Sequence, residues 1–178
     1  VALICTISLS AQNVSDSLHV KSNFKIGEVV MPLSLIGAGT LGFVEPIRNS
    51  RYEVRDFLEE WRGDHRVTAD DYMQYVPLAS VYGLSLLGAE AKHNYVDRTL
   101  EFAASYVFLG VVVNGIKYTV REPRPNGSAN NSFPSGHTAT TFMGAELVRI
   151  EYGDESPWFS VGAYTIAAAV GVLRVYNN

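Results

Sequence analysis

Apolar stretches of helical length, separated by short polar turns, dominate the chain. Runs that alternate apolar and polar residues, as strands do, are few, and there is no internal repeat. Apolar residues make up 47% of the 178 residues, which is enough for one domain with a real core. The pattern therefore predicts an all-α fold, with apolar helices at about 27–44, 76–91, 97–118, 135–151 and 158–175 and an amphipathic segment at 51–61.

The length of the apolar runs bears on whether helices cross a membrane, because a span needs about 20 mainly apolar residues. The run 102–116 is interrupted by Ser105 and Asn114, and the run 158–173 is short and rich in Ala and Gly. Ala and Gly permit close helix packing in a bilayer and in a water-soluble bundle alike. The mean hydropathy of +0.07 is low for a protein that is mostly membrane. We expect some of these helices to be embedded in a membrane, with a water-soluble bundle as the alternative.

The first eleven residues form an apolar run that ends in small residues and precedes the polar stretch 12–16. This pattern is typical of the end of a signal peptide, and a first strand of the fold is the alternative. The expected organisation is the tail of a signal peptide at 1–11 and a single α-helical domain at 12–178. The only cysteine, Cys5, lies in the apolar run, so the mature protein would contain no disulfide.

The charge balance excludes a general attraction to polyanions. The chain has 14 basic and 18 acidic residues, and its formal charge is −4. No global field draws it to nucleic acid or to anionic lipid, so any anion site must be local. The histidines His19, His65 and His93 have no helical spacing to another ligand, which argues against a metal site. We expect no metal, no cofactor and no nucleic-acid partner.

A local group of cations lies at the end of the apolar run 97–118 and just after it. Lys117 is expected at the end of this helix, and Arg124 stands between Pro123 and Pro125, which stiffen the loop. The planar fork of an arginine donates two parallel hydrogen bonds to phosphate oxygens, while a lysine supplies a compact point charge. The segment is therefore suited to hold a phosphate group.

Eight residues separate Pro125 from the segment Pro134-Ser135-Gly136-His137, which is expected to open the next helix. The first turn of a helix presents free backbone N–H groups, which form an anion site. Gly136 has no Cβ to block an approaching phosphate, and the Ser135 hydroxyl adds a donor. His137 is placed to give a proton to a leaving alkoxide, which is typically worth about 10² to 10⁴ in rate. A structural histidine bonded to the backbone is the alternative.

Together these residues resemble the K-x6-RP and PSGH motifs of the type 2 phosphatidic acid phosphatase family, which also includes bacterial acid phosphatases and vanadium haloperoxidases. The resemblance extends from Lys117 to Arg174, in a motif-bearing part at about 95–178, and leaves the preceding residues without an assignment. It implies a helical bundle of this family's type and His137 as the general acid. The phosphate would be held by Lys117, Arg124, Ser135, Gly136 and Arg174.

The third motif of that family is an Arg, five residues, a His, three residues and an Asp. Arg174 matches its first position, and the remaining residues to Asn178 fill part of the spacer. The resemblance therefore implies a nucleophilic His two positions beyond Asn178 and an orienting Asp six positions beyond it. The full protein would form a phosphohistidine intermediate without a metal. The residues up to Asn178 alone should bind phosphate weakly and turn nothing over.

The function implied by the resemblance is a phosphatase of the bacterial cell envelope that faces the periplasm and is integral to or associated with the inner membrane. It would cleave a phosphomonoester or a pyrophosphate, with a lipid phosphate as the favoured substrate. The alternatives are a soluble nonspecific acid phosphatase, a vanadium-dependent haloperoxidase and a noncatalytic phosphate-binding module. The polar segments 70–72 and 92–98 are expected to cap helices or pair at the surface. Arg121 and Glu122 are interpreted as a solvated or locally paired couple outside the site.

Overall fold

The structure is a computed structural model that describes residues 44–63, 65–124 and 129–177. The chain divides into two compact units, Val1–Asn49 and Ser50–Asn178, and the second contains nearly all of the described residues. Helices and no strands are present in the described ranges, so the predicted all-α fold is confirmed. The expected signal peptide tail at 1–11 and nearly all of the expected helix at 27–44 lie outside the described residues.

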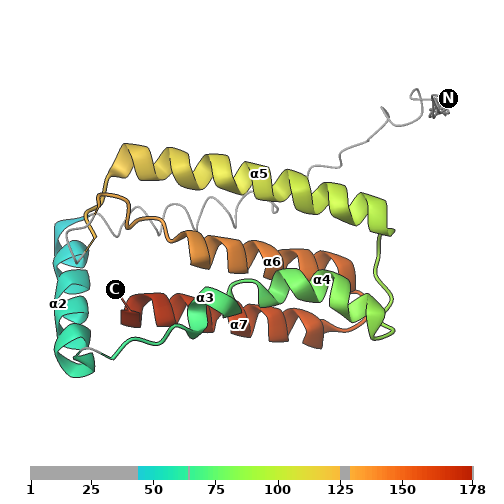
Figure 1. Ribbon diagram of the computed structural model, residues 1–178, viewed down its shortest axis with the longest axis horizontal. Helices are drawn as coiled ribbons and strands as arrows, with labels where there is room; N and C mark the ends of the chain where they lie inside the picture. The colour runs from blue at the N-terminus through green and yellow to red at the C-terminus, as the bar shows by residue number, and fades with distance from the viewer. Residues whose placement is uncertain (1–43, 64, 125–128, 178) are drawn as a thin grey trace, which may run out of the picture. The chain divides into compact units, whose positions relative to one another are not determined.

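Helices account for most of the described chain (Figure 1). In chain order they are α2 (Glu45–Arg62), α3 (Ala69–Met73), α4 (Val76–Leu86), α5 (Tyr95–Val120), α6 (Gly136–Tyr152) and α7 (Pro157–Asn177). The amphipathic segment 51–61 lies within α2, and α3 was not expected. The prediction that a helix continues to residue 91 is wrong. Helix α4 ends at Leu86, and Gly88 has a φ of 98°, in the left-handed region that favours glycine and ends helices.

Side-chain caps fix the beginnings of two of the helices that carry motif residues, α5 and α6. The Asn94 side chain accepts hydrogen bonds from the backbone of Val96 and Asp97 at the start of α5. At the start of α6 the Ser135 hydroxyl oxygen accepts from the backbone N–H of Thr138. Both are N-cap residues of the preferred kind, because their oxygens satisfy backbone donors that the first turn leaves open. Local sequence therefore sets where the site elements begin.

The core lies between α4, α6 and α7. Helices α6 and α7 pack along each other, and α4 packs against α6 (Figure 1). The approach of α4 and α6 is close at Gly144, where an added Cβ would lie 2.9 Å from the backbone nitrogen of Leu78. The buried apolar side chains of the core are Leu78, Val81, Ala145, Leu147, Val148, Tyr152, Ala163 and Ala167.

A buried polar network ties α4, α5 and α6 together. Arg98, at the start of α5, donates to the carbonyl oxygen of Val81 at 2.8 Å and to the hydroxyl of Tyr152 at 3.1 Å. The Tyr152 hydroxyl donates in turn to the same carbonyl at 2.6 Å. Glu151 is also buried, and its carboxylate lies 3.6 Å from Nε of Arg98. Because buried charges are costly unless paired, this network explains how the two charged groups stay inside the bundle.

Two helices, α5 and α7, are long and apolar enough to cross a membrane, by length and composition. Large apolar side chains of α5 face away from the described core, with Val107, Phe108 and Val111 each more than 60% exposed. An extended exposed apolar face of this kind marks an interaction with a membrane or another protein.

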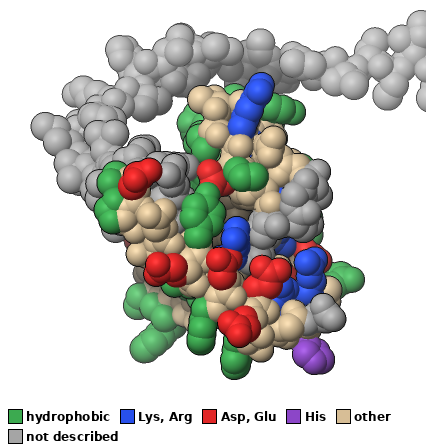
Figure 2. All heavy atoms as spheres, turned by 90° about the vertical axis from the view of Figure 1, so that its left-hand side faces the viewer, with side chains coloured by type: hydrophobic (Ala, Val, Ile, Leu, Met, Phe, Trp, Pro, Cys, Tyr) green, Lys and Arg blue, Asp and Glu red, His purple; other side chains and the backbone are tan. Residues whose placement is uncertain are grey.

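The arrangement of the helices brings several termini to one end of the bundle. Helix α5 ends, α6 begins and α7 ends on the left of Figure 1, with α3 nearby. Figure 2 looks onto this end and shows acidic and basic side chains gathered side by side. Residues that are far apart in the sequence therefore meet in one place.

Candidate active site

The loop between α5 and α6 positions two of the cations that the sequence predicts for phosphate binding, Lys117 and Arg124, through hydrogen bonds to Asn131. Lys117, in the last turn of α5, donates from Nζ to the carbonyl oxygen of Asn131 at 3.1 Å. Arg124 donates from Nε to the side-chain oxygen of Asn131 at 2.7 Å. Lys117 also lies close enough to Arg124 and Arg174 for their positive charges to repel one another. Three positively charged groups from separate segments thus share one region, which favours an anionic ligand.

The beginning of α6 contributes Ser135 and Gly136, as the sequence predicts. Ser135 is the N-cap residue, and Gly136 is the first residue of the helix. A Cβ built on Gly136 would meet no other atom within 4 Å, so the space beside this backbone is open. An open approach to a helix N-terminus is what an oxyanion requires to reach the backbone donors.

Arg174, in the last turn of α7, forms an ion pair that the sequence does not reveal. Its Nη1 atom lies 2.9 Å from Oδ2 of Asp70 in α3. Asp70 is buried, and its other oxygen accepts from the side-chain amide of Asn177 at 3.0 Å. The Nε atom of Arg174 is buried and has no hydrogen-bond partner among the described residues. Asp70 and Asn177 therefore hold the guanidinium in one orientation at the end of the bundle.

His137 contacts the second carboxylate of α3. Its Nε2 atom lies 2.9 Å from Oδ1 of Asp71, and the same oxygen is 3.9 Å from Nη1 of Arg174. The ring of His137 is about one third exposed, so it is accessible to a substrate as well as to Asp71. The partner of the ring is a carboxylate rather than a backbone group, which is the arrangement expected of a positioned acid or base.

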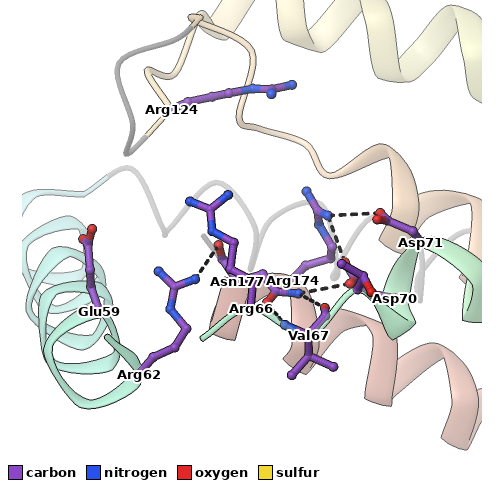
Figure 3. Close-up of a pocket in the computed structure, with 10 residues that line it drawn as sticks. Glu59, Arg62, Arg66, Val67, Asp70, Asp71, Arg124, Arg174 and Asn177 are labelled. Carbon is purple, nitrogen blue, oxygen red and sulfur yellow. Dashed lines mark hydrogen bonds and ion pairs between the residues drawn. The ribbon is translucent and has the colours of Figure 1, made fainter. Parts of the chain in front are cut away.

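Two of the predicted site residues, Arg124 and Arg174, line a polar cavity of about 240 Å³ (Figure 3), whereas Lys117, Ser135, Gly136 and His137 are not among its lining residues. Arg124 approaches it from the α5–α6 loop, and Arg174 lies on the opposite side with Asp70 and Asp71. Asn177 also lines the cavity, and the end of α2 and the segment that follows it supply the remaining residues. Those residues are Glu59, Arg62, Arg66, Val67 and Thr68.

A larger and mainly apolar groove of about 550 Å³ begins beside the same site. Its lining includes Ser135 and Arg174 together with Phe142 and Val175. A further apolar groove of about 410 Å³ is lined by Phe142, Gly171 and Val175 as well, so the two share residues of α6 and α7. Ser135 and Arg174 thus line a groove whose apolar part is suited to an apolar chain.

Arg121 and Glu122, which we interpreted as a couple outside the site, form hydrogen bonds near the end of α5. Arg121 ends α5 in the left-handed region with a φ of 51° and donates to the carbonyl oxygen of Tyr118. The carboxylate of Glu122 accepts a hydrogen bond from the Tyr52 hydroxyl at 3.0 Å. Neither residue lines the polar cavity, whereas Asp70 and Asp71, which we expected to cap helices or pair at the surface, do line it.

One group of side chains in the described ranges could hold a metal ion: His93, Glu101 and Glu151. His93 Nδ1 lies 2.9 Å from one oxygen of Glu151, and this hydrogen bond raises the pKa of His93. The other oxygen of Glu151 lies 3.6 Å from Arg98, which already supplies a positive charge there. The group therefore forms a complete ion-pair network without a metal, and the absence of a metal stays a prediction.

Three residues of the candidate site were missed by the sequence analysis: Asp70, Asp71 and Asn131. Asp71 is 66 residues from His137, and Asp70 is 104 residues from Arg174. No local pattern connects positions this far apart. Asn131 lies within the motif loop, but its role depends on the path of the loop and not on a spacing.

The site combines cations from α5, the following loop and α7 with the N-terminus of α6 and a histidine held by a carboxylate. Donors of these kinds are chemically suited to binding a phosphoryl group. Among curated proteins, the chain is similar to a lipid A 1-phosphatase from Porphyromonas gingivalis, with 35% identity over 147 residues, or 82% of this chain and 32% of that protein. The chain thus spans about a third of the length of this relative. No family model matches, and no solved structure matches.

The similarity to a lipid phosphatase and the two long apolar helices point in the same direction. The name of this relative refers to a phosphorylated lipid, and α5 and α7 are long and apolar enough to cross a membrane.

Proposed function

We propose that the protein is a metal-independent phosphohydrolase of the type 2 phosphatidic acid phosphatase family, which removes phosphomonoester or pyrophosphate groups from lipid phosphates at the periplasmic face of a bacterial membrane. The observation that carries the proposal is that Lys117, Arg124 and Arg174 lie in one region and that Arg174 shares a groove with Ser135, the N-cap of α6. These groups belong to four separate segments, and each is a preferred donor to phosphate.

The proposed roles follow from the contacts. Lys117 and Arg124 would bind the non-bridging phosphate oxygens from the loop side, and Arg174 would bind them from α7. Ser135 and Gly136 would add the hydroxyl and backbone donors of the α6 N-terminus. Because these donors are already held by Asn131 and Asp70, they need little reorganisation when charge develops on the phosphoryl group.

His137 is the proposed general acid. A nucleophilic histidine, expected two positions beyond Asn178, would attack phosphorus while the bond to the leaving oxygen breaks. The leaving alkoxide takes a proton from His137, and a water molecule then hydrolyses the phosphohistidine and releases inorganic phosphate. Covalent catalysis of this kind divides one difficult hydrolysis into two easier steps.

The apolar grooves support a lipid substrate over a small soluble phosphoester. They begin at Ser135 and Arg174 and continue past Phe142 and Val175. A phosphate bound in the polar site would place an attached acyl chain at the mouth of this surface. A small soluble phosphoester would not fill apolar grooves beside the site, and a soluble acid phosphatase would not need the exposed apolar face of α5.

The first test is the coding sequence beyond Asn178. A His two positions on and an Asp four positions after it would support the phosphohistidine mechanism. Other residues at those positions would contradict it, because the mechanism assigns His137 to the general acid and needs a separate histidine as the nucleophile.

The second test is the activity of the full-length protein in detergent micelles on a phosphorylated lipid and on p-nitrophenyl phosphate. Arg124→Ala should lower kcat/KM by about tenfold or more, because it removes charge-assisted hydrogen bonds worth about 1.5–3 kcal/mol. Arg149→Ala is a matched control, since Arg149 is an exposed arginine of α6 paired with Glu146. Activity should persist in EDTA. Loss of activity that added metal restores, or equal activity of Arg124→Ala and the parent, would reject the proposal.

A further inference from the structure

Two arginines that belong to no phosphatase motif line the polar cavity. Arg62 is the last residue of α2, and Arg66 follows in the segment before α3. In Figure 3 the side chains of both enter the space that Arg124 faces from the loop side. The cavity therefore has more positive groups than the motif residues alone would give it.

Arg62 is a buried cation without a carboxylate partner among the described residues. The residue is only 7% exposed. One guanidinium nitrogen donates to the carbonyl oxygen of Asn177 at 3.3 Å, and the group lies 6.0 Å from the ring centre of Tyr176. Its Nε atom is buried and has no hydrogen-bond partner in the described ranges. A buried arginine is rarely left without an anionic partner, because a desolvated charge is costly unless it is paired.

The carboxylates of the cavity are mostly engaged elsewhere. Asp70 binds Arg174 and Asn177, and Asp71 binds His137. Glu59 is the remaining acidic residue of the lining. No carboxylate of the described residues lies within ion-pair distance of Arg62 or Arg66, and Arg124 is held by the neutral Asn131. The cavity therefore retains positive charge on the side of α2.

We propose that Arg62 and Arg66 form a second anion subsite, next to the cage for the scissile phosphate, which binds a second phosphoryl group of the substrate. This inference rests on the proposed function, because it defines the substrate of the same site more closely. A phosphoryl group has several acceptor oxygens and more than one negative charge, so it can accept from both guanidinium groups at once. The substrate would be a pyrophosphate or a headgroup that carries two separate phosphates.

The test is calorimetric titration of the purified protein with anions that cannot be hydrolysed. Methylenediphosphonate represents a pyrophosphate, propane-1,3-diphosphonate represents two separate phosphates, and inorganic phosphate represents a single group. We expect at least one diphosphonate to bind about tenfold or more tightly than phosphate. The diphosphonate that binds more tightly identifies which of the two arrangements the subsite accepts.

Arg66→Gln should remove the advantage of the diphosphonate and leave the affinity for inorganic phosphate unchanged. Arg66 is exposed, so this variant should fold normally. Arg62→Gln should act in the same direction, and Arg62→Lys would replace it if circular dichroism showed a loss of helix. Arg149→Gln, which changes an exposed arginine of α6 outside the cavity, should alter neither affinity.

The outcomes separate this inference from the proposed function. An Arg66→Gln protein that binds diphosphonate as tightly as the parent, or that loses phosphate and diphosphonate equally, would overturn the second subsite. Phosphate binding that is absent, or insensitive to Arg124→Gln, would count against the cage for the scissile phosphate. Equal affinity of the parent for phosphate and both diphosphonates would overturn the second subsite alone.

Discussion

The carboxylate of Asp71 lies 2.9 Å from Nε2 of His137, so a residue of the short helix α3 holds the ring of a residue in the first turn of α6. A carboxylate that binds one nitrogen of an imidazole fixes the orientation of the ring and stabilises its protonated form, as in Ser-His-Asp sites. Asp71 is thus a positioning residue for the proposed general acid.

Asp71→Asn should slow the reaction mainly where the leaving group needs a proton. We expect kcat for a lipid or alkyl phosphate to fall about 10 to 100-fold, which is at or below the lower end of the range for losing a general acid, because His137 itself is still present. Hydrolysis of p-nitrophenyl phosphate should change much less, because nitrophenolate leaves without protonation. Steady-state kinetics of the full-length enzyme on both substrates measures the difference. Asp56→Asn, on the exposed side of α2, is the control. Equal losses on both substrates would remove the positioning role.

Phe142→Ala should separate lipid from small substrates. Phe142 lines both apolar grooves and is 41% exposed. Removing the ring takes apolar contact from a bound acyl chain, and we expect this to weaken binding of the chain by about 1–2 kcal/mol. That loss corresponds to a roughly five to thirtyfold fall in kcat/KM for a long-chain lipid phosphate. The value for p-nitrophenyl phosphate should stay the same. Phe108→Ala, on the exposed face of α5 outside these grooves, is the matched control. A uniform loss on both substrates would show that the grooves do not hold the chain.

Gly144→Ala should destabilise the bundle without touching the site. The added methyl group would lie 2.9 Å from the backbone nitrogen of Leu78, so α4 and α6 would have to separate. Overpacking of this kind costs about 1–3 kcal/mol. Gly83→Ala in α4 is the opposite case, because its Cβ would meet nothing within 4 Å, and it should stabilise the helix by about 0.5–1 kcal/mol. Unfolding followed by circular dichroism would give both values. A neutral Gly144→Ala would show that the two helices pack less closely than described.

Glu146 should make a small, pH-dependent contribution to stability. Its hydrogen bonds from Arg149, at 2.5 and 2.8 Å, lower its pKa from the usual 4.5. A carboxyl group with a lowered pKa in the folded state stabilises the protein above about pH 4.5, and the contribution is lost as the pH falls through the folded-state pKa. Both side chains are about half exposed, so we expect about 0.5 kcal/mol or less.

The measurement is the free energy of unfolding of the parent and of Glu146→Gln between pH 7 and pH 3. The difference between the two proteins should shrink as the pH falls, because the parent then loses the charge that the variant never has. A difference that grows on acidification would contradict the assigned pKa direction.

The sequence predicts the elements whose causes are local. Ser135 and Asn94 cap α6 and α5 near the expected positions, because N-cap chemistry depends on neighbouring residues only. Helix α3 has five residues, which is too short to show a helical period. The partners of His137 and Arg174 could not be predicted, since they come from α3, 66 and 104 residues away. These contacts are fixed by helix packing and not by spacing.

Asn131 accepts a hydrogen bond from Lys117 through its backbone and from Arg124 through its side chain. A neutral amide therefore determines the direction of two like charges without reducing the field between them. An aspartate at this position would accept the same bond from Arg124 but would cancel part of that charge. An ion pair usually fixes the direction of a cation and neutralises it at the same time, whereas the α5–α6 loop only fixes the direction. A bound anion therefore meets donors that are fixed and still fully charged.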